Sequence, residues 1–191
     1  SSDVCSSDLL NLIDLALDKC KEVISVTDGV RHPILPISIV GPSDKYYGEV
    51  VKLMVADYGI KTYEDSSKEA YDDTFKIDEK DIKSVIDNDE DSSPYNASSL
   101  IILYEPEDGK RLLFAGDANT TSLQMMLNKY KWLRDVDFLK VPHHGSRRNL
   151  NTSIIEALSP QKCYISAAGN KKHPSGRLVY WLAKYGDVYS T

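Results

Sequence analysis

Short apolar runs that end in polar residues recur along the second half of the chain. Leu112–Phe114 and residues 138–141 are two of them, and their length and composition predict buried β-strands. Between them, residues 120–131 carry apolar side chains at helical spacing, and Asn119 or Thr120 can cap that helix. The pattern therefore predicts a strand, a helix and a second strand in succession.

The same reading along the rest of the chain gives further elements. An amphipathic helix is expected over residues 9–23. A strand is expected over 34–40, and Pro36 makes its first part an edge or a bend. The next helix is expected over 44–58, capped by Ser43, with Tyr47, Val50, Val51 and Met54 facing inward. A hairpin is expected from 98–104 and 111–115, helices over 153–158 and 175–185, a strand over 162–167, and the start of another at Val188.

The middle of the chain, residues 61–94, is acidic and poor in large aliphatic side chains. We interpret it as an inserted loop or lid with at most a short helix around Ile82, Val85 and Ile86. Its paired acids, including those of residues 89–91, are interpreted as a solvated charge run rather than as metal ligands. We interpret residues 1–8 as a low-complexity leader, non-native or disordered, outside the fold, and we expect residues 9–191 to form one domain.

Composition limits which classes of protein and which partners the chain is compatible with. The 191 residues, 41% of them hydrophobic, suffice for one sizeable core. The net charge of −6 argues against a polyanion partner, but residues 140–148 and 171–177 are locally basic. Three cysteines without paired spacing argue against a disulfide framework, and Cys163 is expected to be a small buried hydrophobe. No apolar segment is long enough to span a membrane and no signal peptide is evident, so cytoplasm is the default location.

Polar side chains follow three of the predicted strands. Asp117 comes after the first, His143 and His144 after the second, and His173 lies on the loop after the third. Each alone is compatible with a turn or a solvated loop, but sheets flanked by helices place ligands at such strand ends. The hairpin also sets Asn96 at the same edge as Asp117. A carboxylate beside neutral imidazoles suits a divalent transition metal such as zinc.

Three motifs resemble a known family. Leu-Phe-Ala-Gly-Asp at 113–117, Lys-Val-Pro-His-His-Gly-Ser at 140–146 and His-Pro at 173–174 are similar to the later motifs of metallo-β-lactamase-fold hydrolases. The branch that includes the hydrolase domain of ComEC-type competence proteins is the most similar, over roughly residues 95–191. The resemblance implies an α+β sandwich in αββα order, of which this chain would supply mainly the C-terminal half.

The resemblance also implies roles for individual residues. Asp117 would be a carboxylate that bridges two metal ions, and His144, or His143 beside it, would be a ligand of the second ion. His173 would lie near the substrate, and Asn96 stands where many relatives have a further histidine. The implied cofactor is one or two divalent ions, Zn²⁺ or alternatively Mn²⁺.

One family motif is absent. The early His-x-His-x-Asp-His ligand set does not occur, and the first histidine of the chain is His32, in Arg-His-Pro. We therefore interpret the chain as a fragment rather than a degenerate relative, inactive by itself. The expected function of the complete form is metal-dependent hydrolysis of a phosphate-containing substrate, with nucleic acid as a candidate. An ester or thioester hydrolase and a non-catalytic binding module are the alternatives, and the oligomeric state is left open.

Overall fold

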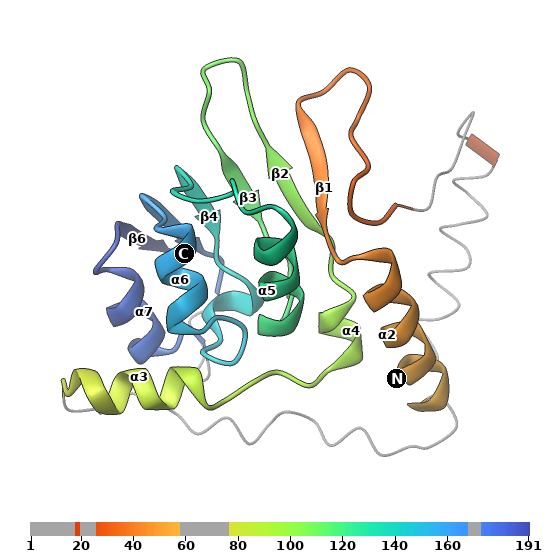
Figure 1. The fold of residues 1–191 in the computed structure, drawn as a ribbon. Coiled ribbons are helices and arrows are strands. Elements are labelled where there is room, and N and C mark those ends of the chain that lie inside the picture. Colours follow the sequence, from red (N-terminus) through yellow and green to blue (C-terminus); the bar gives the residue numbers. More distant parts are fainter. Residues whose placement is uncertain (1–17, 20–25, 58–76, 168–172) are drawn as a thin grey trace.

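The computed structural model describes residues 18–19, 26–57, 77–167 and 173–191. In these residues six strands and six helices follow one another along the chain (Figure 1). They are β1 (Ile37–Gly41), α2 (Asp44–Asp57), α3 (Glu79–Asp87), α4 (Pro94–Ala97), β2 (Ile101–Tyr104), β3 (Leu112–Phe114), α5 (Thr120–Lys129), β4 (Phe138–Lys140), α6 (Thr152–Leu158), β5 (Lys162–Ile165), α7 (Gly176–Leu182) and β6 (Asp187–Ser190).

The strands form one mixed sheet in the order β1-β2-β3-β4-β5-β6. The first three strands pair antiparallel, and β3 to β6 pair parallel. The predicted hairpin is thus confirmed as β2 and β3, and the predicted strand–helix–strand unit as β3, α5 and β4. Because β3 and β4 are parallel neighbours, their carboxyl ends lie at the same edge of the sheet.

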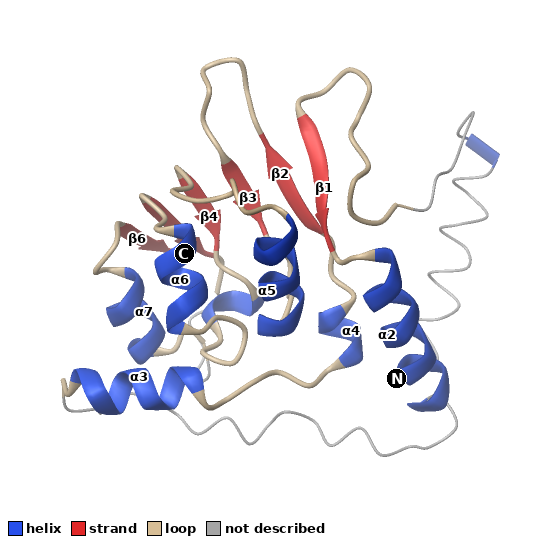
Figure 2. Cartoon of the chain, viewed as in Figure 1, coloured by secondary structure: helices blue, strands red, loops and turns tan. Residues whose placement is uncertain are grey.

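One face of the sheet forms the core. Its inward side chains alternate along the strands, as the pleat requires, and none of them is exposed. Helices α5, α6 and α7 cover this face (Figure 2), and their buried residues and those of α3 join the strands in a single apolar cluster. The strand residues in it include Ile101, Leu103, Leu113, Leu139, Cys163 and Ile165. Burial raises the pKa of the Cys163 thiol to about 12, which confirms the expectation of an inert buried hydrophobe.

The opposite face of the sheet is mixed, and it is only partly covered by the described residues. Phe114 is 36% exposed and Tyr164 is 37% exposed. Phe138 contacts both, with ring centroids 5.6 Å from Phe114 and 6.4 Å from Tyr164. Lys140 and Lys162 lie beside these rings in the strand register, so an aromatic cluster sits among lysines on this face.

Helix α3 comes from the acidic middle segment. The short helix predicted there is confirmed, but Ile82 and Ile86 are completely buried in the core, so this part is not a loose loop. The Lys184 ammonium on the chain after α7 donates to Glu79 at 2.9 Å, which ties the start of α3 to that helix. Residues 61–76 of the predicted insertion lie outside the described residues.

Near the amino-terminal side, the predicted helix after Ser43 is confirmed as α2. The Ser43 hydroxyl caps it by accepting from the Tyr46 N–H at 3.3 Å. Val50 is buried as expected, whereas Tyr47 is 37% exposed, so the prediction that Tyr47 faces inward is wrong. The helix predicted over residues 9–23 lies outside the described residues except for positions 18 and 19. None of the described helices has the length and apolar character needed to cross a membrane.

Candidate functional site

The turn His143–Gly145, directly after β4, brings the candidate residues together. The His143 N–H donates to the Gly116 carbonyl at 3.1 Å, which joins this turn to the tip of β3, next to Asp117. The His143 ring lies 5.4 Å from the His173 ring and 6.1 Å from the His144 ring, measured between centroids. The three strand tips therefore meet, although the chemical roles assigned to their residues stay predictions.

The backbone of this turn is left-handed at three successive residues. The φ angles are +43° at His143, +55° at His144 and +82° at Gly145. Residues other than glycine adopt this region at a cost of about 1–2 kcal/mol each. The surrounding contacts must hold the two histidines in place against that cost, and a side chain at Gly145 would have its Cβ 2.8 Å from the Pro174 Cβ. Contacts with the surrounding residues thus hold the turn in this conformation, as is common for strained segments at functional sites.

We expect Gly145→Ala to destabilise the fold by about 2 kcal/mol, because the new Cβ adds a clash with Pro174 to an unfavourable φ. Urea unfolding of both proteins measures the difference. Gly109→Ala is the matched control, since Gly109 has φ +77° but open space around its Cβ position. That variant should lose only about 1 kcal/mol, the backbone cost alone. Equal losses at the two glycines would contradict the steric argument.

The His143 ring is held by a buried carboxylate, that of Asp91, which is 4% exposed. Asp91 Oδ2 accepts from Asn96 Nδ2 at 2.7 Å and from Asn149 Nδ2 at 3.0 Å, and it lies 3.3 Å from His143 Nδ1. The other oxygen accepts from the Ser93 N–H at 2.9 Å. The anion therefore has donors on both oxygens, which is the condition for keeping a charge away from water.

This arrangement moves the pKa of both partners. Burial by itself would raise the pKa of Asp91, but the hydrogen bonds from His143, Asn96, Ser93 and Asn149 outweigh it and hold the pKa well below its usual range. The hydrogen bond with Asp91 raises the pKa of His143 against the opposing effect of burial, and the nearby charge of Asp117 raises it further. The two shifts have the directions expected for one ion pair.

Since the two shifts are opposite, the pair should stabilise the fold only between two pH limits. The lowered pKa of Asp91 contributes stability that is lost as pH falls below about 4. The raised pKa of His143 contributes stability that is lost as pH rises above about 6.5. The stability difference between the wild-type protein and Asp91→Asn, from urea unfolding across pH, should therefore peak between these values. A difference independent of pH would contradict the ion pair.

His144 is exposed, and its orientation is fixed by the backbone. Its Nδ1 lies 2.6 Å from the Ser166 carbonyl oxygen. A carbonyl only accepts, so Nδ1 is the protonated nitrogen, and Nε2 is left with a lone pair that can bind a metal or accept a proton. Two adjacent histidines would point apart in a strand, but the left-handed turn allows both to belong to one site.

Asp117 lies near Lys140 and His143. Its N–H donates to Ser99 Oγ at 3.2 Å and its carbonyl accepts from Asn149 Nδ2 at 3.1 Å, so the backbone of Asp117 is fixed on both sides. Burial lowers the pKa of Lys140, while the charge of Asp117 raises it. The charge of the Asp117 carboxylate thus acts on both the Lys140 ammonium and the His143 imidazole.

Sequence reasoning missed Asp91 and Asn149 and misjudged the surroundings of Asn96. The prediction that the acids of residues 89–91 are solvated is wrong for Asp91, which tertiary contacts bury and surround with donors. Asn96 does reach the site, but its amide nitrogen points to Asp91 and His143. Local sequence shows only the turn to Ser93, because the other partners of the Asp91 carboxylate lie 5, 52 and 58 residues away.

The predicted positive charge around the site is largely paired. Arg147 and Arg148 both bind the Asp89 carboxylate, at 3.2 and 2.9 Å, and Arg177 lies 3.5 Å from Asp81. Each of these arginines therefore has an acidic partner from the middle segment, which the chain order alone does not reveal. Arg147 and Arg148 share one carboxylate, so the locally positive charge expected from the sequence is reduced but stays a prediction. Lys171 and Lys172 lie outside the described residues.

The described residues do not complete a metal site. Among them, no three side chains of His, Cys, Asp or Glu are arranged to hold a metal ion. Asp117 and the free Nε2 of His144 are donors of the right type for zinc, but a catalytic zinc site needs three protein ligands. The donor chemistry thus suits such an ion, while the number of donors falls short.

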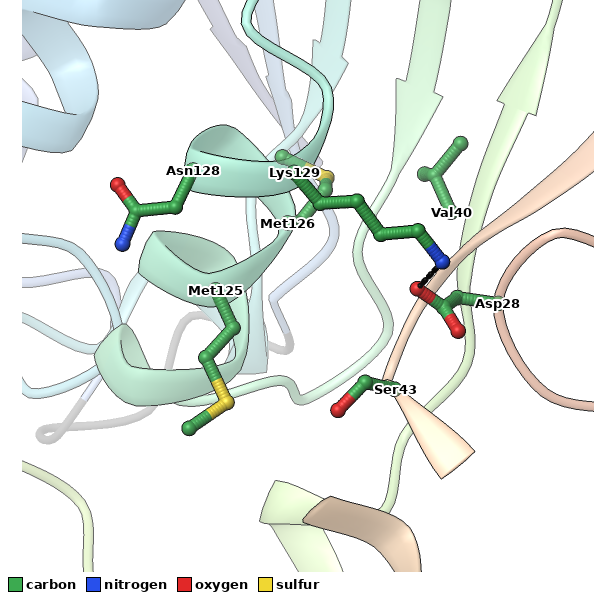
Figure 3. Close-up of a pocket in the computed structure, with 7 residues that line it drawn as sticks. All are labelled: Asp28, Val40, Ser43, Met125, Met126, Asn128 and Lys129. Carbon is green, nitrogen blue, oxygen red and sulfur yellow. Dashed lines mark hydrogen bonds and ion pairs between the residues drawn. The ribbon is translucent and has the colours of Figure 1, made fainter. Parts of the chain in front are cut away.

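Two cavities lie beside the sheet. The first, about 360 Å³, is lined by residues before β1, at its end and on α5, and the Lys129 ammonium closes one side by pairing with Asp28 at 2.6 Å (Figure 3). The second, about 310 Å³, lies between α2 and the amino-terminal end of α5 and touches the back of the site at Asp91 and Asn119. Neither lining includes Asp117 or the three histidines of the strand tips.

Comparison with known proteins gives one informative similarity. No family model matches the chain. Over 97 residues, half of this chain, the sequence is 30% identical to ComE operon protein 3 of Bacillus subtilis strain 168. The matched part covers 12% of that protein, so the chain spans a small fraction of its relative's length. The similarity supports the relation to ComEC-type proteins that the motifs indicate.

Proposed function

We propose that the chain carries part of the active site of a metal-dependent hydrolase related to the ComEC-type branch of the metallo-β-lactamase fold. The observation that carries the proposal is the meeting of Asp117, His143, His144 and His173 at the strand tips, with His143 held by Asp91. The similarity to ComE operon protein 3 supports it. A solvated loop would not require two histidines in left-handed backbone conformation.

In this proposal each residue has a distinct task. Asp117 and His144 Nε2 would hold a divalent ion, which when bound supplies Lewis acidity to the site. His143 would accept or donate a proton through Nε2, because its Nδ1 is occupied by Asp91 and Asn149. His173, beside His143, would contact the substrate. The ligands beyond Asp117 and His144 would come from outside the described residues.

A phosphodiester is the substrate class we favour, as in the nuclease-like members of the branch that the motifs resemble. An ester or thioester is the alternative, and the pairing of Arg147 and Arg148 with Asp89 removes one argument for a phosphate. A non-catalytic binding module is the competing class. Fold-level similarity is a weak basis for a substrate, so the chemistry has to be tested directly.

The aromatic cluster of Phe114, Phe138 and Tyr164 on the outer face of the sheet supports the finer assignment of the fold. In an αββα sandwich a second sheet would cover this face, and Phe114, Phe138 and Tyr164 would become interior residues. A one-sided sheet with such a stack of rings is otherwise unusual for a separate domain. We therefore propose that the described sheet is one layer of a two-layer sandwich.

If this outer face is open in the purified chain, Phe114→Ser should cost only about 1 kcal/mol and reduce the fluorescence of a dye that binds apolar surface. The reason is that Phe114 is 36% exposed in the described structure. Leu113→Ser is the control, because Leu113 is the next residue but is fully buried on the helix-covered face. That control should lose far more stability. Unchanged dye binding by Phe114→Ser would contradict an open apolar face.

Metal binding is the first test of the proposed function. Isothermal titration of the purified chain with Zn²⁺ and Mn²⁺ should show binding that Asp117→Ala weakens at least roughly tenfold. Asp108→Ala is the control, because Asp108 is an exposed acid whose partner is Lys110. Binding of equal strength in Asp117→Ala would overturn the assignment, and absence of any binding would show that this chain does not hold the ion without further ligands. The substrate class is tested in a longer form of the protein that supplies the remaining metal ligands. Hydrolysis of a model phosphodiester but not of a thioester would support the favoured class, whereas hydrolysis of the thioester alone would support the alternative.

A further inference from the structure

We infer that Asp91 and Asn149 are positioning residues that lock His143 in one neutral tautomer, with the proton on Nδ1 and a free lone pair on Nε2. The consequence for catalysis rests on the proposed function, but the tautomer itself is a property of the described network. The tautomer depends on which atom of each neighbouring side-chain amide faces the His143 ring, and the hydrogen-bond partners of Asn96 and Asn149 determine the orientation of both amides.

The orientation of the Asn149 amide follows from its surroundings. One end of this amide lies 3.0 Å from Asp91 Oδ2, 3.1 Å from the Asp117 carbonyl and 3.3 Å from the Ala118 carbonyl. All three are acceptors, so this end is the NH₂ group. The other end, which faces His143 Nδ1 at 3.2 Å, is therefore the carbonyl oxygen Oδ1.

His143 Nδ1 thus faces two acceptors, Asp91 Oδ2 at 3.3 Å and Asn149 Oδ1 at 3.2 Å. The Asn96 amide nitrogen is also 3.3 Å away and has a second hydrogen besides the one it donates to the Asp91 carboxylate at 2.7 Å, but this single long contact does not offset two acceptors, one of them an anion. If Nδ1 carried no proton, its lone pair would face a buried anion and a carbonyl oxygen. A proton on Nδ1 satisfies both acceptors, so this is the stable tautomer.

The network is rigid enough to impose this choice. Asp91 is 4% exposed and Asn149 is fully buried. The backbone of Asp91 is fixed in both directions, because its N–H donates to the Arg148 carbonyl at 3.0 Å and its carbonyl accepts from Asn119 Nδ2 at 3.2 Å. Neither partner can turn away from the ring at low cost. His143 is therefore presented with Nε2 as its reactive atom before any ligand arrives.

Nitrogen NMR of the full chain tests this inference directly. The protein has only four histidines, so selective ¹⁵N labelling of histidine gives four ring systems, and His143→Gln identifies the one of interest. At about pH 9, where imidazoles are neutral, the His143 spectrum should show a protonated Nδ1 and an unprotonated Nε2. A wild-type spectrum with the proton on Nε2 would overturn the inference without any need for a variant.

Asp91→Asn should shift the tautomer ratio toward Nε2–H by roughly tenfold or more, since a hydrogen bond to a charged acceptor is lost. Asp89→Asn is the matched control, two residues away and paired with Arg147 and Arg148, and it should leave the ratio unchanged. An equal effect of the two variants, or no effect of Asp91→Asn, would refute the positioning role. A protonated Nδ1 in a chain that fails to bind Zn²⁺ would support the tautomer lock and count only against the proposed function.

Discussion

Replacing Asp91 with alanine is expected to lower the free energy of unfolding by about 3 kcal/mol, a large effect for one acidic residue in an acidic segment. The physical reason is the set of donors that the carboxylate satisfies. Without it, the side-chain amides of Asn96 and Asn149 and the Ser93 N–H lose an acceptor in a buried place. Leaving a buried donor unsatisfied costs more than the net gain from making the bond.

Asp89→Ala is the control for this prediction. Asp89 lies in the same segment, but its partners, Arg147 and Arg148, stay in contact with water. Partly exposed ion pairs contribute about 1 kcal/mol or less, so this variant should remain close to the wild-type stability. Urea unfolding followed by circular dichroism measures all three proteins. Similar losses for the two variants would show that Asp91 is no more than a surface acid.

Ile86→Ala should also destabilise the fold by about 3 kcal/mol, because it removes a fully buried aliphatic side chain and leaves a cavity. Ile86 and Ile82 are the two residues through which α3 packs on the core. The same helix leads directly into the segment that carries Asp91. If α3 is less firmly packed on the core, the contact between Asp91 and His143 should therefore weaken too.

Val85→Ala, on the same helix, provides the comparison. Val85 is only half-buried, and it loses fewer methyl contacts on truncation, so a cost of about 1 kcal/mol or less is expected. Urea unfolding gives both values, and the ¹⁵N spectrum of His143 in Ile86→Ala reports whether the site is affected. Equal costs at Ile86 and Val85 would mean that α3 is not anchored as described.

The variants at Asp91 and Ile86 both test how the acidic middle segment is connected to the core and the site, a connection that does not follow from the order of residues along the chain. Residues 79–91, interpreted from the sequence as part of an acidic insertion, supply both a helix anchored in the core by Ile82 and Ile86 and the acid that holds His143. The acids that remain at the surface pair with Arg147, Arg148 and Arg177. The middle segment therefore contributes to packing, charge balance and the site at once.

The sequence by itself determined the elements and the chain positions of the candidate residues. Apolar runs such as Leu112–Phe114 and the helical spacing before Lys129 are local patterns, and secondary structure follows local patterns when the periodicity is strong. The hairpin predicted at β2 and β3 brought Asn96 toward Asp117, and the parallel strand ends brought His143 toward both. The strand pattern of residues 162–167 also predicted that Cys163 is buried.

Only the tertiary structure decided what surrounds those residues. Whether an acid is solvated or buried depends on residues distant in sequence: Asp91 and Asp89 are two positions apart, yet one is enclosed by Asn149 and His143 and the other pairs at the surface. The tautomers inferred for His143 and His144 likewise depend on oxygen atoms that other parts of the chain supply, two for His143 and one for His144. Local sequence sets backbone preference, whereas desolvation and hydrogen-bond partners arise from long-range packing, so the charge state and orientation of the site could be read only from the folded chain.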